Sequence, residues 1–244
     1  IMSIKKTYGL IGKNIDYSFS VKYFGQKFND EKIIDSEYVN FDLREIEDFN
    51  NLEILKINGL NVTIPYKEKI ITYLDQVDKA ASIIGAVNTI AKKDNKLIGY
   101  NTDYIGFIES FKNNLNFKNA LILGTGGASK AIQYALNIKN INFDIGSRKN
   151  NKKYISYDLI NEKIKDYDLI INTTPLGTFP DVSKKPKINY NLINENHFCY
   201  DLIYNPEKTS FLKECEKKGA RIMNGLEMLK SQAEESWIIW NSVS

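Results

Sequence analysis

A glycine-rich loop between a predicted strand and a predicted helix constrains the fold of this chain most strongly. The apolar run at residues 120–123 predicts a buried strand, and residues 131–136 predict a helix. Between them lies Gly124-Thr125-Gly126-Gly127-Ala128-Ser129. Glycine permits a tight turn and a close backbone approach to a pyrophosphate, which the N–H groups of a helix N-terminus attract. The pattern predicts a dinucleotide site, although a glycine-rich turn in another α/β fold, such as that of a methyltransferase, also satisfies it.

Short apolar runs alternate with helix-like spacing along the rest of the chain. Strands are predicted at residues 7–11, 38–41, 59–63, 86–91, 97–100, 143–146, 169–172 and 198–201. Those at 86–91 and 97–100 are predicted to form a pair joined across Asp94 and Asn95. Helices are predicted at residues 21–28, 43–52 and 67–74 and from residue 225 onward. This alternation predicts the α/β fold class with a mostly parallel sheet. We expect a first domain over residues 1–103, a Rossmann-like dinucleotide-binding domain over residues 104–225, and a C-terminal helix, 226–244, that packs back on the first domain.

Composition excludes several other classes of protein. The net charge of +3, without a run of five like charges, gives no argument for binding nucleic acid. Two cysteines and one histidine are too few for a zinc site with four Cys or His ligands, so no metal is expected. The sequence contains no stretch of about 18 apolar residues, so no membrane span is predicted. The first residues lack the apolar core of a signal peptide. Two thiols form no disulfide framework, which favours the cytoplasm.

The segment after the second strand of the dinucleotide domain bears on the choice between NAD and NADP. An acidic residue about 20 positions after the glycine loop binds the 2′-hydroxyl of NAD, whereas arginine suits the 2′-phosphate of NADP. Asp144 stands at about that distance, but it lies inside the predicted strand. The chain leaves the strand through Ser147, Arg148 and Lys149, whose hydroxyl and cations suit a phosphate. We therefore predict NADP; the alternative for this segment is a solvated basic loop.

Four segments of the first domain place Ser, Thr, Asn, Lys or Asp next to predicted strands. They are residues 16–20, 59–67, 85–89 and 99–106. Open α/β sheets bind ligands at strand ends, which makes these segments candidate binding positions. A single Ser or Thr at such a place is more often a helix cap, but four segments in one domain favour a ligand site.

Seven segments, in order along nearly the whole chain, resemble motifs of the shikimate dehydrogenase family. They are residues 61–67, 85–89, 99–103, 124–129, 172–177, 201–206 and 225–233. The resemblance implies a small-molecule enzyme, a monomer or homodimer, that reduces 3-dehydroshikimate to shikimate with NADPH in the biosynthesis of chorismate and aromatic amino acids. The first domain would then bind the substrate. Tyr17, Val21 and Ser147 depart from the family, which usually has histidine, proline and asparagine there.

The resemblance also implies roles for individual residues. Lys67 would act as the proton donor, and Asp103 would orient its ammonium group. Substrate contacts are implied for Ser18, Ser20, Asn61, Thr63, Asn88, Tyr204 and Gln232. Cofactor contacts are implied for Gly124, Thr125, Gly126, Gly127, Ala128, Ser147, Arg148, Lys149, Thr174, Pro175, Leu202 and Gly225. Pro65 predicts that Lys67 lies in the first turn of a helix, and His197, outside all of these segments, is interpreted as structural.

Two other functions stay open at this stage. One is a quinate/shikimate dehydrogenase that uses NAD(H), which Ser20 and Ser147 disfavour. The other is a catalytically silent sensor that binds the ligand and regulates a partner. The presence of Lys67 and Asp103 argues against the sensor.

Overall fold

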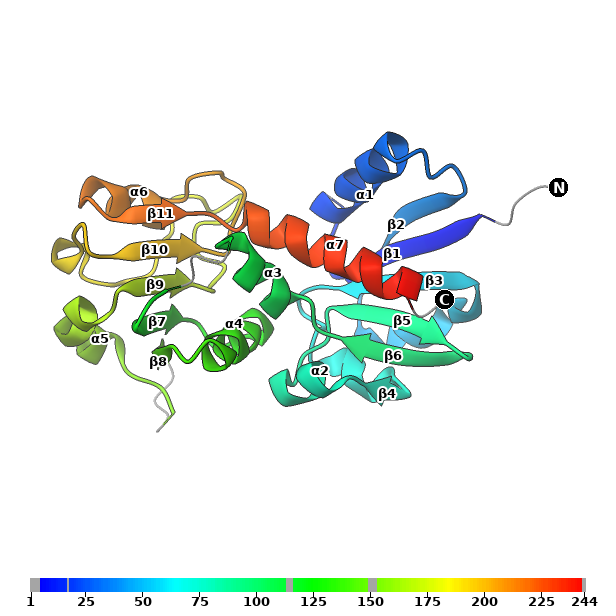
Figure 1. The fold of residues 1–244 in the computed structure, drawn as a ribbon, viewed down its shortest axis with the longest axis horizontal. Coiled ribbons are helices and arrows are strands. Elements are labelled where there is room, and N and C mark those ends of the chain that lie inside the picture. Colours follow the sequence, from blue (N-terminus) through cyan, green and yellow to red (C-terminus); the bar gives the residue numbers. More distant parts are fainter. Residues whose placement is uncertain (1–4, 17, 113–115, 149–152, 243–244) are drawn as a thin grey trace. The chain divides into compact units, whose positions relative to one another are not determined.

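The computed structural model describes residues 5–16, 18–112, 116–148 and 153–242, and these form two compact units (Figure 1). Unit 1 comprises residues 1–102 and 232–244, and unit 2 comprises residues 103–231. Each unit contains its own sheet. The chain belongs to the α/β fold class, as predicted.

The sheet of unit 1 has the strand order β2-β1-β3-β5-β6-β4. Its strands are β1 (Lys6–Gly12), β2 (Ser36–Asp42), β3 (Ile57–Val62), β4 (Gln76–Val77), β5 (Thr89–Lys93) and β6 (Lys96–Tyr100). Strands β2, β1 and β3 are parallel, and helix α1 (Phe19–Asp30) connects β1 to β2. Strand β5 is antiparallel to β3 and β6. The carboxyl ends of β1, β2 and β3 therefore share one edge of the sheet, where polar residues follow them.

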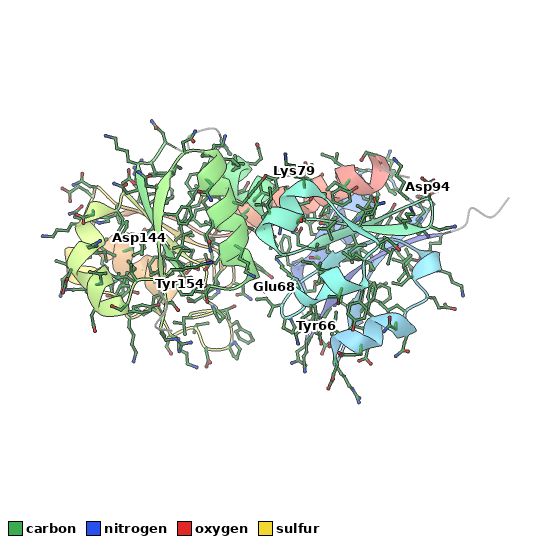
Figure 2. All side chains as sticks on the ribbon, turned by 90° about the horizontal axis from the view of Figure 1, so that it is seen from below. Tyr66, Glu68, Lys79, Asp94, Asp144 and Tyr154 are labelled. Carbon is green, nitrogen blue, oxygen red and sulfur yellow. The ribbon has the colours of Figure 1, made fainter. Side chains whose placement is uncertain are left out.

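Strands β5 and β6 form the predicted hairpin across Asp94 and Asn95. Both residues have positive φ, 50° and 60°, which is the backbone of a two-residue type I′ turn. Lys93 pairs with Lys96 on either side of the turn, at which Figure 2 labels Asp94. Asparagine and aspartate tolerate this left-handed backbone, which explains why the sequence identified the turn.

Two helices predicted in unit 1 are 3₁₀-helices instead of α-helices. The segment predicted as 43–52 forms η1 (Ile46–Asn51), and the segment predicted as 67–74 forms η3 (Lys69–Tyr73). The apolar residues of the first segment recur every three positions, which matches the three residues per turn of a 3₁₀-helix. Lys67 lies in the turn before η3, so the prediction that it lies in the first turn of a helix is wrong. Helix α2 (Lys79–Ile84) was not predicted from the sequence.

The C-terminal helix α7 (Leu226–Ser242) packs on the sheet of unit 1 through aromatic residues. The indole Nε1 of Trp240 donates to the carbonyl of Ile90 at 3.0 Å, and its ring stacks on Tyr8 with the centroids 4.9 Å apart. A Cβ at Gly59 would lie 2.4 Å from that nitrogen. Glycine at position 59 is therefore what allows the indole to lie against β3.

The sheet of unit 2 is parallel throughout and has the order β11-β10-β9-β7-β8. Its strands are β7 (Asn119–Leu123), β8 (Asn142–Gly146), β9 (Leu169–Asn172), β10 (Phe198–Asp201) and β11 (Arg221–Met223). Its helices are α3 (Asp103–Ser110), α4 (Gly127–Ile138), α5 (Tyr157–Lys163) and α6 (Ser210–Lys217). Helices α5 and α6 and strand β11 were not predicted from the sequence.

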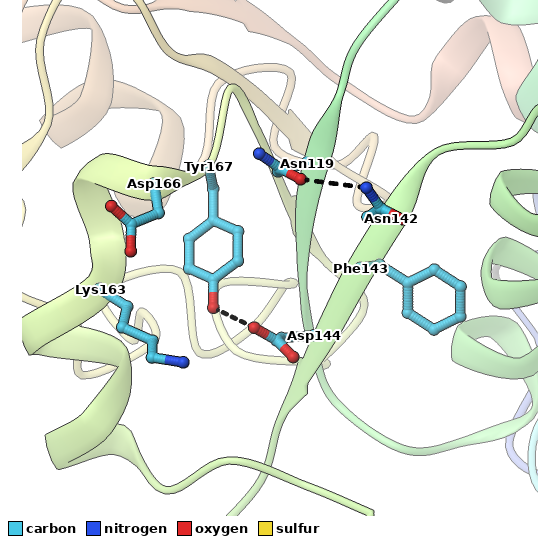
Figure 3. Close-up of a pocket in the computed structure, with 7 residues that line it drawn as sticks. All are labelled: Asn119, Asn142, Phe143, Asp144, Lys163, Asp166 and Tyr167. Atoms are coloured by element: carbon cyan, nitrogen blue, oxygen red, sulfur yellow. Dashed lines mark hydrogen bonds between the residues drawn. The ribbon is translucent and has the colours of Figure 1, made fainter.

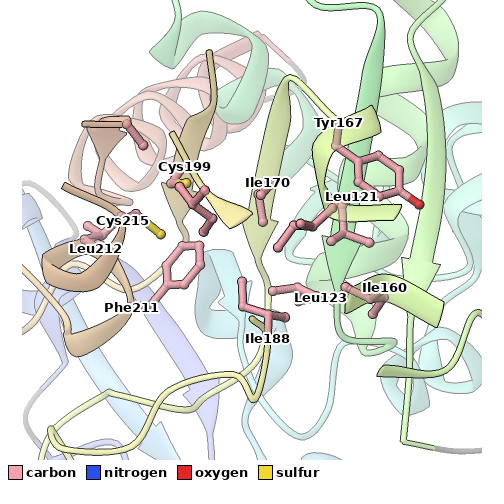
Figure 4. Packing of buried hydrophobic residues seen from close by; sticks show 13 residues of the cluster. Leu121, Leu123, Ile160, Tyr167, Ile170, Ile188, Cys199, Phe211, Leu212 and Cys215 are labelled. Carbon is pink, nitrogen blue, oxygen red and sulfur yellow. The ribbon is translucent and has the colours of Figure 1, made fainter. Parts of the chain in front are cut away.

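A buried apolar cluster joins the sheet of unit 2 to α5 and α6 (Figure 4). Leu121 and Ile170 contribute from neighbouring strands, and Phe211 and Cys215 contribute from α6. Burial of such side chains contributes about 25 cal/mol for each Å² of apolar surface removed from water. The cluster fixes β7 and β9, whose carboxyl ends carry the predicted cofactor residues.

His197 has the contacts of a structural residue. It is buried, its Nδ1 accepts from the backbone N–H of Asn194 at 3.1 Å, and its Nε2 lies 3.2 Å from the carbonyl of Ile164. A carbonyl accepts and cannot donate, so Nε2 carries a proton and donates it to Ile164. Among the described residues, no helix is both long enough and apolar enough to cross a bilayer. In that same part of the chain, no three His, Cys, Asp or Glu side chains are placed to hold a metal ion.

Candidate active site

The segment after β3 carries the predicted residues Thr63 and Lys67, both half-buried. The N–H of Thr63 donates to the carbonyl of Ile11 at 2.8 Å, which holds it beside the end of β1. The carbonyl of Lys67 accepts from the N–H of Val87, also at 2.8 Å. Lys67 is thus fixed through its backbone to the predicted 85–89 segment, directly before Asn88.

Three predicted substrate residues, Asn61, Asn88 and Gln232, belong to one buried hydrogen-bonded cluster. The side-chain nitrogen of Asn61 donates to the carbonyl of Asn88 at 3.2 Å. The side-chain nitrogen of Asn88 donates to Oε1 of Gln232, also at 3.2 Å. Buried amides need partners, and the cluster supplies them from β3, β5 and α7. The structure therefore brings together residues that are distant in the sequence.

Four residues of this cluster were not named as site residues: Tyr38 and Ser236, and also Thr89 and Thr102, which lie within the predicted segments 85–89 and 99–106. The Tyr38 hydroxyl donates to Oδ1 of Asn61 at 2.8 Å, and the Asn88 side chain donates to the Thr102 hydroxyl at 2.9 Å. Outside the predicted segments, Ser236 also had a usable sequence signal. Ser236 follows Gln232 by four residues in a predicted helix, so both lie on one face.

Ser18 and Ser20 lie at the start of α1. Ser18 is the N-cap residue, and its hydroxyl oxygen accepts from the backbone N–H of Ser20 at 3.1 Å. The capping role that was the alternative for these serines is therefore present at Ser18, where the hydroxyl hydrogen is left to donate elsewhere. Burial raises the pKa of Tyr38 far above its usual range, and an interaction with the Ser20 side chain opposes part of that shift.

Asp103 is the buried first residue of α3. The residues directly before it are fixed by hydrogen bonds to the 85–89 segment. The N–H of Thr102 donates to Oδ1 of Asn88 at 2.6 Å, and the side chain of Asn101 donates to the carbonyl of Ala86 at 2.9 Å. A carboxylate in the first turn also interacts favourably with the helix dipole. Asp103 begins unit 2, whereas Lys67 belongs to unit 1.

The glycine loop of unit 2 has the backbone that the sequence predicted. Gly124 has a φ of 118°, and a Cβ there would lie 2.5 Å from the hydroxyl oxygen of Thr173. Gly126 caps α4 without a side-chain hydrogen bond, and a Cβ there would meet no atom within 4 Å. Thr125, Gly127 and Ala128 are half-buried around it. Open space at a helix N-terminus that has no side-chain cap fits the phosphates of a dinucleotide.

Two of the predicted 2′-phosphate residues, Ser147 and Arg148, follow a strand that ends beside this loop. The N–H of Gly124 donates to the carbonyl of Gly146 at 3.1 Å, so the end of β8 adjoins the glycine loop. Ser147 follows and is buried, while Arg148 is exposed. Burial raises the pKa of Tyr157, and the charge of Arg148 opposes that rise, which places the two side chains near each other. Lys149 lies outside the described residues.

Asp144 does not belong to the glycine-loop site. Its Oδ2 accepts from the hydroxyl of Tyr167 at 2.6 Å, in a pocket of about 220 Å³ (Figure 3). Asn119 and Asn142, the first residues of β7 and β8, also line this pocket. The glycine loop follows the opposite end of β7. The pocket is therefore distinct from the dinucleotide site.

The remaining predicted cofactor residues meet at the carboxyl ends of β9 and β10. The Thr174 hydroxyl donates to Oδ1 of Asn172 at 2.7 Å, and the N–H of Leu202 donates to the carbonyl of Asn172 at 3.0 Å. A Cβ at Gly225 would lie 2.0 Å from the carbonyl oxygen of Leu202, so only glycine fits there. Pro175 is exposed directly after Thr174.

Two side chains near this edge have raised pKa values. Tyr204 is half-buried, and burial raises the pKa of its hydroxyl. Asp201 is fully buried at the end of β10, and burial raises the pKa of its carboxyl to about 6. Three donors oppose that rise: the Thr209 hydroxyl, the N–H of Ile203 and the Asn172 side chain. No role was predicted for Asp201 from the sequence.

Comparison with known proteins connects this site to a family. The family model described as the shikimate dehydrogenase substrate binding domain matches residues 10–90. The shikimate dehydrogenase (NADP(+)) of Clostridium botulinum strain Hall is 42% identical over 249 residues, covering 96% of each chain. That of Methanococcus vannielii is 38% identical over 257 residues, covering 95% of this chain and 90% of the relative.

A solved structure gives the same result. The shikimate 5-dehydrogenase of Thermus thermophilus, in complex with NADP(H) and shikimate, superposes with a TM-score of 0.88. It is 28% identical, and the match covers 97% of this chain and 94% of that one. Sequence identity over nearly the full length and the shared two-sheet fold agree with the motifs described above. The chain belongs to the shikimate dehydrogenase family.

Proposed function

We propose that this protein is a shikimate dehydrogenase that reversibly reduces 3-dehydroshikimate to shikimate with NADPH, a step in the biosynthesis of chorismate and aromatic amino acids. The observation that carries the proposal is the buried cluster of Asn61, Asn88 and Gln232, to which the backbone of Lys67 is attached through Val87 and Asn88. The side-chain amides of this cluster and the ammonium group of Lys67 would suit a ligand that carries several hydroxyl groups and a ketone.

The substrate is assigned to unit 1 as a carboxylate with ring oxygens. Ser18 and Ser20 would bind the carboxylate, since two hydroxyl groups at the start of α1 can donate to it near the positive end of the helix dipole. Asn61, Thr63, Asn88 and Gln232 would bind ring oxygens. Tyr204 of unit 2 would complete the recognition of the substrate.

Proton transfer is assigned to Lys67 and Asp103. The Lys67 ammonium would donate a proton to the ketone oxygen as it becomes a hydroxyl, and would take the proton back in the reverse direction. Asp103 would orient that ammonium group, since its carboxylate only accepts hydrogen bonds when ionised. The bonds from Thr102 to Asn88 and from Asn101 to Ala86 would keep Asp103 at its position.

The cofactor is assigned to unit 2, where NADPH, when bound, supplies the hydride. Gly124, Gly126 and Gly127, with Thr125 and Ala128, would bind the pyrophosphate. Ser147, Arg148 and Lys149 would bind the 2′-phosphate. The nicotinamide would contact Thr174, Pro175, Leu202 and Gly225. The lack of a side chain at Gly225 would leave room for the ring.

Unit 1 with the end of α7 is thus proposed as the substrate domain, and unit 2 as the NADP-binding domain. We propose that the protein acts in the cytoplasm as a monomer or a homodimer. The test of the function is to incubate the protein with 3-dehydroshikimate and NADPH and to follow the NADPH absorbance. Loss of absorbance with shikimate as the identified product is expected. Unchanged NADPH at high protein concentration would overturn the proposal.

A further inference from the structure

Ser236 has no role in the function proposed above, yet it lies at the centre of the polar cluster. It is fully buried in α7, one helical turn after Gln232. Its Oγ accepts from the side-chain nitrogen of Asn61 at 2.9 Å and lies 2.7 Å from the hydroxyl oxygen of Thr89. Its own hydrogen points to the carbonyl of Gln232, 2.9 Å away. One hydroxyl thus joins β3, β5 and α7.

The orientation of the Asn61 carboxamide follows from its neighbours. The carbonyl of Asn88 accepts and never donates, so the atom that faces it at 3.2 Å must be the nitrogen of Asn61. That nitrogen carries two hydrogens, and Ser236 supplies the shortest acceptor for them in the described structure. The carboxamide oxygen consequently faces Tyr38, whose hydroxyl donates to it at 2.8 Å.

This arrangement limits what Asn61 offers to a ligand. Both of its amide hydrogens are directed at protein acceptors, chiefly Asn88 and Ser236. Its oxygen accepts one bond from Tyr38 and keeps a second lone pair. Asn61 is 5% exposed, so only a small part of it is accessible to a ligand. The ligand group that meets it must therefore donate a hydrogen bond, as a hydroxyl does and a ketone or ether oxygen does not.

The geometry points to Ser236 as a positioning residue that holds the Asn61 carboxamide so that its oxygen accepts from a ring hydroxyl of the substrate. This inference rests on the proposed function and deepens it, because it assigns a direction to one substrate hydrogen bond. Without the Ser236 hydroxyl, one amide hydrogen of Asn61 loses its shortest acceptor, and the carboxamide is free to rotate. Binding of the ring hydroxyl should weaken, while the proton donor is unaffected.

The test compares Ser236→Ala with Ser110→Ala in steady-state kinetics with shikimate and NADP⁺. Ser110 is a matched control, since it is a buried helical serine whose hydroxyl also donates to a carbonyl of its own helix, that of Phe107. Ser236→Ala should raise KM for shikimate about threefold to tenfold and leave kcat within about twofold. Ser110→Ala should leave both constants near the wild-type values. An unchanged KM in folded Ser236→Ala would overturn the inference.

Analogues of shikimate separate positioning from general loosening. With 4-deoxyshikimate or 5-deoxyshikimate, whichever lacks the hydroxyl that Asn61 accepts from, the KM values of wild type and Ser236→Ala should be equal. The corresponding fluoro analogue, which cannot donate a hydrogen bond, should bind wild type as weakly as the deoxy compound. A KM penalty of the same size with shikimate and with both deoxy analogues would overturn the inference.

Failure of this inference is distinguishable from failure of the proposed function. Wild-type protein that turns over shikimate, together with a Ser236→Ala variant of unchanged KM, overturns the positioning role alone. Wild-type protein that neither binds nor oxidises shikimate, measured by calorimetry and by NADPH formation, overturns the function and this inference with it. Matching circular dichroism spectra of the two variants check that both are folded.

Discussion

The hydroxyl of Tyr167 donates a hydrogen bond of 2.6 Å to the carboxylate of Asp144. Asp144 is the acidic residue that a simple spacing rule would assign to the ribose of NAD, and this bond engages it in a separate pocket (Figure 3). Arg148 instead follows β8 next to the glycine loop and is exposed. The contrast between these two side chains favours NADP as the cofactor.

Arg148→Ala should lower kcat/KM with NADP⁺ about tenfold or more and change the value with NAD⁺ little, since a charge-assisted bond to phosphate contributes about 1.5–3 kcal/mol. Asp144→Asn is the matched control and should leave the ratio of the two kcat/KM values unchanged. Equal losses with both cofactors in Arg148→Ala would show that the arginine does not select NADP. A drop with NAD⁺ in Asp144→Asn would return the ribose role to Asp144.

Lys67→Ala should lower kcat by about 10²- to 10⁴-fold, the usual contribution of a general acid or base, while the protein stays folded. Lys69→Ala is the control, because Lys69 is an exposed lysine two residues further along the same segment. Steady-state rates with shikimate and NADP⁺ measure both. Near-normal turnover by Lys67→Ala would remove Lys67 from the proton transfer.

Ser18 and Ser20 should respond differently to alanine, because only Ser18 caps α1. Ser20→Ala should raise KM for shikimate more than it lowers kcat, since carboxylate binding is largely common to ground and transition states. Ser18→Ala should do the same and also lower the free energy of unfolding by about 1 kcal/mol. Urea titrations and kinetics separate the two effects. Equal stabilities, or an unchanged KM in both variants, would contradict these assignments.

Asp201 should make stability depend on pH between about pH 4 and pH 7. Burial raises the pKa of its carboxyl to about 6, so the folded state binds the proton more tightly than the unfolded state. The stabilisation of the folded state by this proton is complete below the ordinary carboxyl pKa, and it is lost as pH rises through 6. As pH rises over this range, the free energy of unfolding of wild type should fall by up to about 3 kcal/mol relative to that of Asp201→Asn, as measured by urea titrations. If the difference in free energy of unfolding between wild type and Asp201→Asn stays constant with pH, the pKa of Asp201 is not raised.

Much of the fold followed from local sequence patterns. The buried runs of β7, β9 and β10 and the Asp94-Asn95 turn are local signals, because apolar periodicity and turn chemistry act over a few residues. The two 3₁₀-helices were misassigned as α-helices because apolar residues three apart fit both helix types over one or two turns. Strand β4, with two residues, is too short to give any pattern.

The candidate site was predicted in part. Motif resemblance identified Asn61, Asn88 and Gln232, which the structure joins by hydrogen bonds. It did not identify Ser236, which bonds to Asn61 from 175 positions away. Helical spacing places Ser236 on the same face as Gln232, but no local pattern tells which distant residue its hydroxyl meets. The functional roles of all these residues stay predictions until the variants are measured.

One set of rates decides whether this protein is an NADP-dependent shikimate dehydrogenase. Wild-type kcat/KM would be measured from the formation of reduced cofactor for shikimate and for quinate, each with NADP⁺ and with NAD⁺. Shikimate with NADP⁺ should give the highest value, about tenfold or more above each other pair, which is about 1.4 kcal/mol in transition-state binding. A highest value for quinate with NAD⁺, or no reduced cofactor from any pair, would overturn the assignment of this activity to the protein.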